Sequence, residues 1–432
     1  FAPRKRRRKQ EDINALMRER ALNIPDSELD EDSPSWLQSA VRLNRELGGA
    51  FPLTGNNSVD LEIDYATSIA QMAADVRTAR TDVNVLFYTM ALDETTRDFF
   101  AALGEVADRG VTVRVLYDHW GGSLSHRKQY KAMRRFLDEH RIEHYPMMPI
   151  KPFSDGAFQR PDLRNHRKLL VVDGETGWMG SQNMIASHYN KGTNIRRGLH
   201  WQETMARLRG PIVTEINLLF AIDWYYESGD ELSEETLVRP APDTSGTYEC
   251  QMVPSGPPGF VFENNLLLFN QLFYSAQERI VAVSPYFVPD ESMLAALQTA
   301  ARRGVEVELF VSEIGGDQFL VFHAQRSYYA ALLEAGGVRI WLYRSPTILH
   351  AKHVTVDDSV TVIGSSNMDI RSFLLDMESS LMIGGTDFME KMRVVEADYR
   401  EHSRELTLEE WNSRPLPMAL LDNVCRLASS VV

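Results

Sequence analysis

Basic residues are scarce in this chain of 432 residues. Lysine and arginine number 46 against 60 aspartates and glutamates, a formal net charge of −14 at pH 7. Affinity for the phosphates of nucleic acids comes mostly from surplus lysine and arginine. The balance therefore argues against a general nucleic-acid-binding protein, although it does not exclude a local basic pocket.

Cysteines and long apolar runs are also scarce. Cys250 and Cys425 are the only cysteines, too few for a disulfide framework and without the paired spacing of a zinc site. No stretch reaches the ~18 to 20 consecutive apolar residues that cross a bilayer. The best candidate, residues 211–226, is interrupted by Glu215 and Asp223, so we expect a buried helix there.

The first residues of the chain carry a concentrated basic run. Residues 4–9 are all lysine or arginine, and the chain opens with Phe1 rather than methionine. Such a run is typical of the cytoplasmic flank of a transmembrane helix. It is equally typical of a nuclear address or of a solvated basic arm.

The body of the chain has the composition of an ordinary globular protein, 44% hydrophobic and 25% charged. A strand-like apolar run, a segment with helical spacing and a second strand-like run follow one another in residues 82–117, and the same order recurs in residues 280–311. Short identities at a constant offset link the two copies, which indicates a duplication. We predict an α/β fold in which helices cover a parallel sheet.

A longer motif, H-x-K-x4-D-x6-G-S-x-N, also occurs twice. Its residues are His166, Lys168, Asp173, Ser181 and Asn183 in the first copy, and His350, Lys352, Asp357, Ser365 and Asn367 in the second. Side chains alternate along a strand, so the histidine and lysine of each copy project to one face, and the aspartate emerges at the far end. Chance production of six matching positions at the same spacing twice in one chain is negligible.

Brought together about a pseudo-twofold axis, the two copies would form one cationic site without a metal or other cofactor. Such a site suits a phosphodiester, because the lysines hold the non-bridging oxygens while the serine and asparagine side chains donate hydrogen bonds to them. One histidine attacks phosphorus and the other protonates the departing alcohol, so the reaction proceeds through a phosphohistidine. Each histidine needs a carboxylate on its other ring nitrogen. The candidates are Asp173, Asp357, Glu203 and Glu378.

The doubled motif resembles that of the phospholipase D superfamily, and the sequence around it is similar to the bacterial cardiolipin synthases of that superfamily. The similar segments are residues 165–183, 205–211, 284–289, 349–371 and 414–416. The resemblance implies two similar α/β units, each a mixed sheet between helices, with the active site at their interface.

The resemblance also implies a mechanism. The histidine, lysine and aspartate of each copy would be catalytic, with His166 as nucleophile, His350 as general acid and then base, and Glu203 and Glu378 supporting the histidines. The reaction would be a transphosphatidylation. One phosphatidylglycerol gives a phosphatidyl-enzyme and glycerol, and the hydroxyl of a second phosphatidylglycerol attacks it to give cardiolipin.

Members of that family usually carry two N-terminal transmembrane helices, and the basic run at residues 4–9 fits the point just after them. We therefore expect attachment to the cell membrane, a catalytic body on the cytoplasmic side, anionic phospholipids as partners and no nucleic acid. The expected divisions are a lead-in segment at 1–50, a first unit at 51–240, a second unit at 241–415 and an apolar tail at 416–432.

Other functions remain compatible with the sequence. A phospholipase D that hydrolyses phospholipid, or a phosphatidyltransferase with another acceptor alcohol, would use the same catalytic groups. A nuclease could carry the same doubled motif, although the acidic balance counts against it. A membrane scaffold without enzymatic activity is a further alternative, and the oligomeric state stays open.

Overall fold

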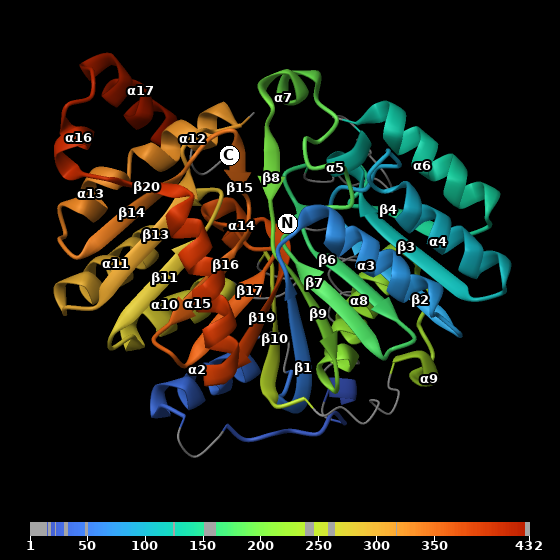
Figure 1. Ribbon diagram of the computed structural model, residues 1–432. Coiled ribbons are helices and arrows are strands. Elements are labelled where there is room, and N and C mark those ends of the chain that lie inside the picture. The colour runs from blue at the N-terminus through green and yellow to red at the C-terminus, as the bar shows by residue number, and fades with distance from the viewer. Residues whose placement is uncertain are drawn as a thin grey trace.

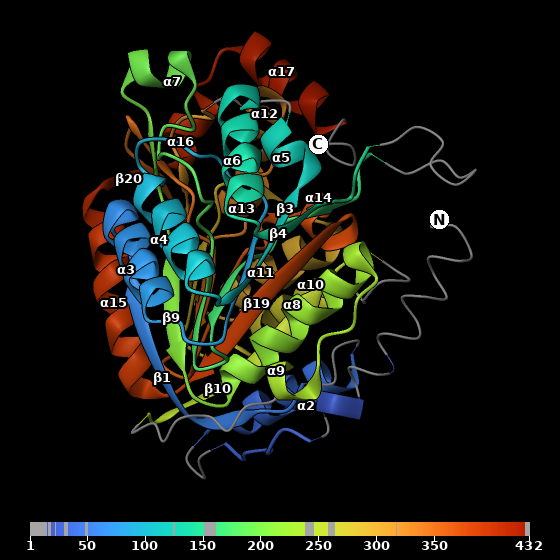
Figure 2. The same ribbon diagram turned by 90° about the vertical axis from the view of Figure 1, so that its right-hand side faces the viewer.

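The computed structural model describes residues 15, 19–21, 23–29, 33–47, 51–123, 126–150, 161–237, 246–257, 264–316 and 318–427. The basic run at residues 4–9 and the last five residues of the predicted tail lie outside these ranges. Figures 1 and 2 show one large twisted sheet through the molecule, with helices on both of its faces. The predicted α/β class, with a mixed sheet between helices, is confirmed.

Among the described residues the sheet has 16 strands: 15 form a continuous path with two related halves that meet at its centre, and β5 (Arg164–Asn165) pairs with β19 beside this path. The first half contains β1 (Thr54–Glu62), β2 (Asp82–Phe87), β3 (Thr112–Asp118), β4 (Glu143–Met147), β6 (Lys168–Val172), β7 (Thr176–Gly180) and β9 (Met205–Arg209). The second half contains β10 (Tyr248–Ser255), β11 (Arg279–Val283), β13 (Glu306–Ser312), β14 (Val338–Tyr343), β16 (His353–Val356), β17 (Val360–Gly364), β19 (Asp376–Gly384) and β20 (Ser403–Leu406).

The order of the strands shows the duplication directly. Outward from the centre, the first half runs β1-β9-β7-β6-β2-β3-β4 and the second runs β10-β19-β17-β16-β11-β13-β14-β20. β1 and β10 pair antiparallel at the centre. Apart from the edge strand β20, each strand thus has its counterpart at the same distance from this line, as a pseudo-twofold axis requires.

Long helices cover both faces of the sheet. They are α3 (Tyr65–Arg77), α4 (Arg97–Asp108), α6 (Arg127–Glu139), α8 (Ile212–Ser228), α10 (Asn264–Ser275), α11 (Glu291–Arg302) and α15 (Thr386–Glu401). The predicted strand, helix, strand units are β2-α4-β3 and β11-α11-β13, and both strand pairs are parallel. The buried helix expected at residues 211–226 is α8, in which Glu215 and Asp223 are both buried.

The remaining elements are shorter or lie at the periphery. The helices are α2 (Ser35–Glu46), α5 (His119–Ser123), α7 (Gly192–Arg197), α9 (Glu234–Leu237), α12 (Phe319–Arg326), α13 (Tyr329–Leu333), α14 (Ile370–Leu374), α16 (Leu408–Asn412) and α17 (Leu416–Arg426). The strands are β5 (Arg164–Asn165), β8 (His200–Gln202), β12 (Phe287–Val288), β15 (Thr347–Leu349) and β18 (Met368–Asp369). In the part of the chain that the structure describes, no helix is both long enough and apolar enough to span a membrane.

The ends of the described chain pack against the second half. Leu37 and Ala40 of α2 are buried in its apolar core together with Leu268 and Phe269 of α10, and Cys425 of α17 belongs to the same core. The burial of apolar side chains is the main favourable term in folding. The lead-in segment and the tail therefore contribute to the core of the second half.

Candidate active site

Two short crossing strands carry the motif histidines into the interface between the halves. β5, just before His166, pairs with β19 of the other half, and β15, just before His350, pairs with β8. The backbone amide of His166 donates to the carbonyl of Met377 over 2.8 Å, and that of His350 donates to the carbonyl of Gln202 over 2.7 Å. Each histidine is thus held by the half that did not supply it.

The supporting carboxylates are exchanged in the same way. Nδ1 of His166 lies 2.9 Å from Oε1 of Glu378, and Nδ1 of His350 lies 2.6 Å from Oε1 of Glu203. Both glutamates are buried. A carboxylate at Nδ1 fixes the imidazole tautomer that leaves Nε2 available for reaction. Of the four carboxylates proposed from the sequence, these two contact the histidines.

The two lysines lie beside their own histidines. Nζ of Lys352 donates to the carbonyl oxygen of His350 over 2.6 Å, and Nζ of Lys168 donates to the carbonyl oxygen of His166. Burial lowers the pKa of Lys168 to about 7 and that of Lys352 to about 8, because an ammonium group loses hydration inside the protein. Binding of an anion between Lys168 and Lys352 would favour the charged form of both lysines.

The surroundings of the two histidines differ in their electrostatics. Burial, reinforced by Lys168, Lys352 and Arg371, lowers the pKa of His166 well below its usual value. Burial also lowers the pKa of His350, but the carboxylate of Glu203 opposes this, and the pKa falls to about 4. A carboxylate thus opposes the effect of burial at His350, whereas cations reinforce it at His166.

Asp173 and Asp357 are not brought to the histidines, contrary to their prediction as catalytic residues. Each aspartate lies just after the strand that follows its motif histidine. The extended chain between the two residues is about 20 Å long. Asp173 accepts the amides of Arg80, Thr81 and Asp82 over 2.8 to 3.1 Å. Asp357 likewise accepts three successive amides, those of Gln277, Glu278 and Arg279. Their role in the structure is to fix the chain where it enters the neighbouring strand.

The motif serines support the glutamates and their strands. The hydroxyl of Ser365 donates to Oε2 of Glu378 and accepts the amide of Ser379 over 3.0 Å. The hydroxyl of Ser181 accepts the amide of Thr204, next to Glu203, over 2.9 Å. The serines predicted to bind substrate are therefore occupied in positioning the carboxylate segments.

The two motif asparagines differ. Oδ1 of Asn183 accepts the amide of Thr89 over 3.1 Å, and its Nδ2 donates to the hydroxyl of Tyr189 over 2.8 Å. Oδ1 of Asn367 is buried without a hydrogen-bond partner among the described residues. A buried amide oxygen left in this state is costly unless a donor from a ligand or water completes it, so Oδ1 of Asn367 is suited to accept a hydrogen bond from a substrate hydroxyl, not to contact a phosphate oxygen.

Two tyrosines beside the histidines were not predicted from the sequence. The ring of Tyr88 meets His166 edge-on with centroids 4.9 Å apart, and Tyr286 meets His350 edge-on at 6.1 Å. Each follows the first strand-like run of its half, and this shared position was the available signal. In the described ranges, no group of three or more His, Cys, Asp or Glu side chains could hold a metal ion.

The fold and the site together define a class. Two halves each supply one histidine, one lysine and the carboxylate that orients the histidine of the other half. Such a centre transfers a phosphorus group in two steps through a covalent histidine.

Comparison with known proteins agrees and is more specific. The family model described as "Cardiolipin synthase, PLD-like domain" matches residues 72–208 and 269–396, once in each half. Cardiolipin synthase A of Proteus mirabilis is 30% identical over 385 residues, which cover 87% of this chain and 76% of that protein. The cardiolipin synthase of Geobacillus kaustophilus is 33% identical over 394 residues, covering 89% and 74%. The chain therefore belongs to the cardiolipin synthase family of phospholipase D-like proteins, as its motif predicted.

Solved structures support the fold. Phosphatidylserine synthase from Haemophilus influenzae superimposes with a TM-score of 0.69 at 15% identity and covers 92% of this chain and all of its own. Polyphosphate kinase from Porphyromonas gingivalis superimposes with a TM-score of 0.52 at 12% identity, over 94% of this chain and 57% of its own. At such identities the likeness concerns the fold alone.

Proposed function

We propose that the protein synthesises cardiolipin from two molecules of phosphatidylglycerol. The observation that carries this proposal is the exchanged pair of His–Glu contacts, which places two oriented histidines and two lysines in one centre. The names of the related proteins supply the substrate class. The reaction takes place at a membrane surface, with the catalytic body on the cytoplasmic side.

In the first step, Nε2 of His166 attacks the phosphorus of one phosphatidylglycerol. The bond from phosphorus to the glycerol headgroup breaks, and Nε2 of His350 gives its proton to the departing oxygen. In the second step, His350 takes the proton from the hydroxyl of a second phosphatidylglycerol. That oxygen attacks phosphorus, the bond from phosphorus to His166 breaks, and cardiolipin is released.

The electrostatics of the site support this division of roles. A nucleophile must be unprotonated, and the pKa of His166 is lowered by burial and by the cations around it. A general acid must carry a proton, and the carboxylate of Glu203 favours the protonated form of His350. The phosphodiester adds a negative charge between the lysines and raises the proton affinity of His350 further.

The test is to incubate the protein with phosphatidylglycerol vesicles and to separate the lipids. Cardiolipin with an equal amount of glycerol supports the proposal, whereas phosphatidic acid as the main product shows a hydrolase. His402→Ala, a histidine exposed at the end of α15, is the matched control and should retain the activity. The same assay with a strong chelator tests the absence of a metal requirement. A loss of activity that a divalent ion restores would contradict it.

A further inference from the structure

Helix α17 has an unusual distribution of side chains. Its carboxylate Asp422 is buried, where it contacts Nδ1 of His323 at 2.7 Å and Nη1 of Arg414 at 2.6 Å. Its apolar residues Leu416, Leu420 and Val424 are 85%, 67% and 54% exposed. These three residues are four apart and therefore share one face of the helix. The helix thus turns its charge inward and an apolar stripe outward.

The stripe continues onto two neighbouring helices. Phe319 and Leu320 at the start of α12 are exposed, and so is Ile195 of α7. Asp422 joins α17 to α12 through His323, and Arg197 of α7 donates to the carbonyl of Gly316, just before α12, over 3.5 Å. In Figures 1 and 2 the three helices lie at the same upper end of the molecule. Large exposed apolar side chains gathered at one end of a molecule indicate an interaction site.

The charges of these three helices favour an anionic partner. Their exposed cations are Arg196, Arg197 and Arg426, and their one acidic residue is the buried Asp422. This contrasts with a chain whose net charge is −14. Exposed apolar side chains with cations and no exposed acid are the composition of a helix that lies in an anionic membrane interface.

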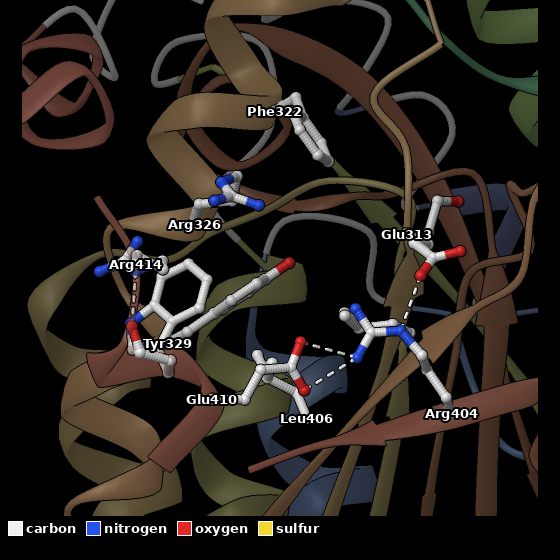
Figure 3. A pocket seen from close by; sticks show the side chains of 11 residues that line it. Glu313, Phe322, Arg326, Tyr329, Arg404, Leu406, Glu410 and Arg414 are labelled. Atoms are coloured by element: carbon white, nitrogen blue, oxygen red, sulfur yellow. Dashed lines mark hydrogen bonds and ion pairs between the residues drawn. The ribbon is translucent and has the colours of Figure 1, made fainter. Parts of the chain in front are cut away.

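The cavity behind this surface does not account for the charge pattern. It measures about 100 Å³ and is lined by side chains of α12, α16 and β20. Figure 3 shows Arg404 there between Glu313 and Glu410, with contacts of 2.7 and 2.9 Å. Arg326 and Arg414 at the same cavity are paired with Asp422. The arginines that line the cavity are paired with carboxylates. An anionic partner would therefore bind at the outer surface.

We propose that α7, α12 and α17 form a docking face that rests on an anionic lipid bilayer. The inference builds on the proposed function, in which both substrates are bilayer lipids. The chain leads directly from this face to the catalytic centre: β8 follows α7 and ends one residue before Glu203, and its partner β15 ends one residue before His350. A lipid headgroup that leaves the bilayer at the docking face would therefore reach the side of the catalytic centre that carries His350.

The test measures binding of the 432-residue chain to vesicles by flotation. All proteins carry His166→Ala, so that turnover does not change the lipid. At about 0.5 M salt, where exposed charges are screened, the double variant Leu420→Glu/Val424→Glu should bind phosphatidylglycerol vesicles at least tenfold more weakly, because inserting an apolar side chain contributes tenfold or more in affinity. Val394→Glu, an equally exposed apolar position on α15, is the matched control and should bind like its parent.

A second variant tests the charges. Arg196→Glu/Arg197→Glu should weaken binding to phosphatidylglycerol vesicles at low salt and leave binding to phosphatidylcholine vesicles nearly unchanged. Equal vesicle binding by the parent and the Leu420→Glu/Val424→Glu variant would overturn the proposal. So would dissociation of a dimer by that variant in sedimentation with vesicle binding intact, since the face would then join two copies.

The outcome is separable from that of the proposed function. Failure of the chain with His166 intact to make cardiolipin, while binding still depends on Leu420 and Val424, would reject the synthase and retain the docking face. Cardiolipin synthesis by the chain, together with vesicle binding that does not depend on Leu420 and Val424, would retain the synthase and reject the docking face.

Discussion

The two sides of the catalytic centre carry the same motif but different neighbours. Before His166, the crossing strand pairs Arg164 with Asp376, whereas before His350 the corresponding register pairs Ile348 with Trp201. Arg164 also contacts Asp118 at 3.3 Å, and Asp376 contacts Arg371 at 3.4 Å. The crossing strand before His166 is therefore part of a buried network of charges, whereas the corresponding pair before His350 is apolar.

This difference shows how a duplicated motif acquires two roles. Arg371, from the charged side, lies close enough to lower the pKa of His166, and on the other side Glu203 favours the protonated form of His350. The motif supplies identical groups, and in the proposed mechanism their different surroundings suit one to be the nucleophile and the other to be the acid. The following predictions test this division, from the largest expected effect to the smallest.

The histidines should fail in different ways. His166→Ala should lose at least 10³-fold to 10⁴-fold in activity with any substrate, because no covalent intermediate can form. His350→Ala should lose a similar factor with phosphatidylglycerol but should still release one equivalent of nitrophenol from a nitrophenyl phosphodiester, whose leaving group needs no proton. Stopped-flow absorbance measures this burst. A burst in His166→Ala and none in His350→Ala would reverse the assignment.

Substitution of the two glutamates should cause the same pattern of defects as substitution of the histidines, with smaller effects. Glu203→Gln and Glu378→Gln should each lower kcat with phosphatidylglycerol by about 10²-fold, since each leaves a histidine without its orienting partner. The defect of Glu203→Gln should shrink with the nitrophenyl ester, and that of Glu378→Gln should not. Glu139→Gln on the exposed side of α6 serves as control. Equal defects of both variants with both substrates would contradict the division.

The lowered pKa values of the two lysines predict that activity falls at alkaline pH. An ammonium group loses its charge as the pH rises through its pKa, which is about 7 for Lys168 and about 8 for Lys352. kcat/KM should therefore decline above about pH 7, by up to tenfold per unit, and more steeply above about pH 8, where Lys352 also loses its charge. Lys168→Arg should keep its charge and move the decline to higher pH, whereas Lys131→Arg on the surface of α6 should not. A profile that stays flat to pH 10 would exclude this role for the lysines.

The aspartates should affect stability more than catalysis. Asp173→Asn should lower the free energy of unfolding by about 1 to 3 kcal/mol, because it weakens hydrogen bonds to three successive backbone amides, and kcat should fall less than tenfold. Burial raises the pKa of Asp173, but the hydrogen bonds from Thr81 and its neighbours lower it by more. Its stabilising contribution is therefore present at neutral pH and lost as the pH falls through this lowered pKa. Urea titrations at pH 7 and pH 3 measure it, and a large loss of kcat would restore Asp173 as a catalytic residue.

Local pattern was enough to predict most of the fold and part of the site. The alternation of apolar runs and helical segments in residues 82–117 and 280–311 predicted the duplicated α/β units, because each signal depends on neighbouring residues only. The roles of Asp173 and Ser365 were not predictable in this way. The partners of Asp173, Arg80 to Asp82, are distant in sequence. Glu378, the partner of Ser365, lies beyond a connection that contains β18 and α14, and strand pairing brings both sets of partners together.

The central claim is that His166 forms the covalent intermediate. The most direct measurement is mass spectrometry of the peptides that contain His166 and His350 after brief incubation of His350→Ala with the nitrophenyl ester of phosphatidic acid, whose leaving group needs no proton, and a quench in base. We predict a phosphatidyl adduct on the His166 peptide of this variant, and on that peptide in the wild-type protein at lower occupancy. An adduct on the His350 peptide of the wild-type protein, or no adduct in any protein that makes cardiolipin, would contradict the account.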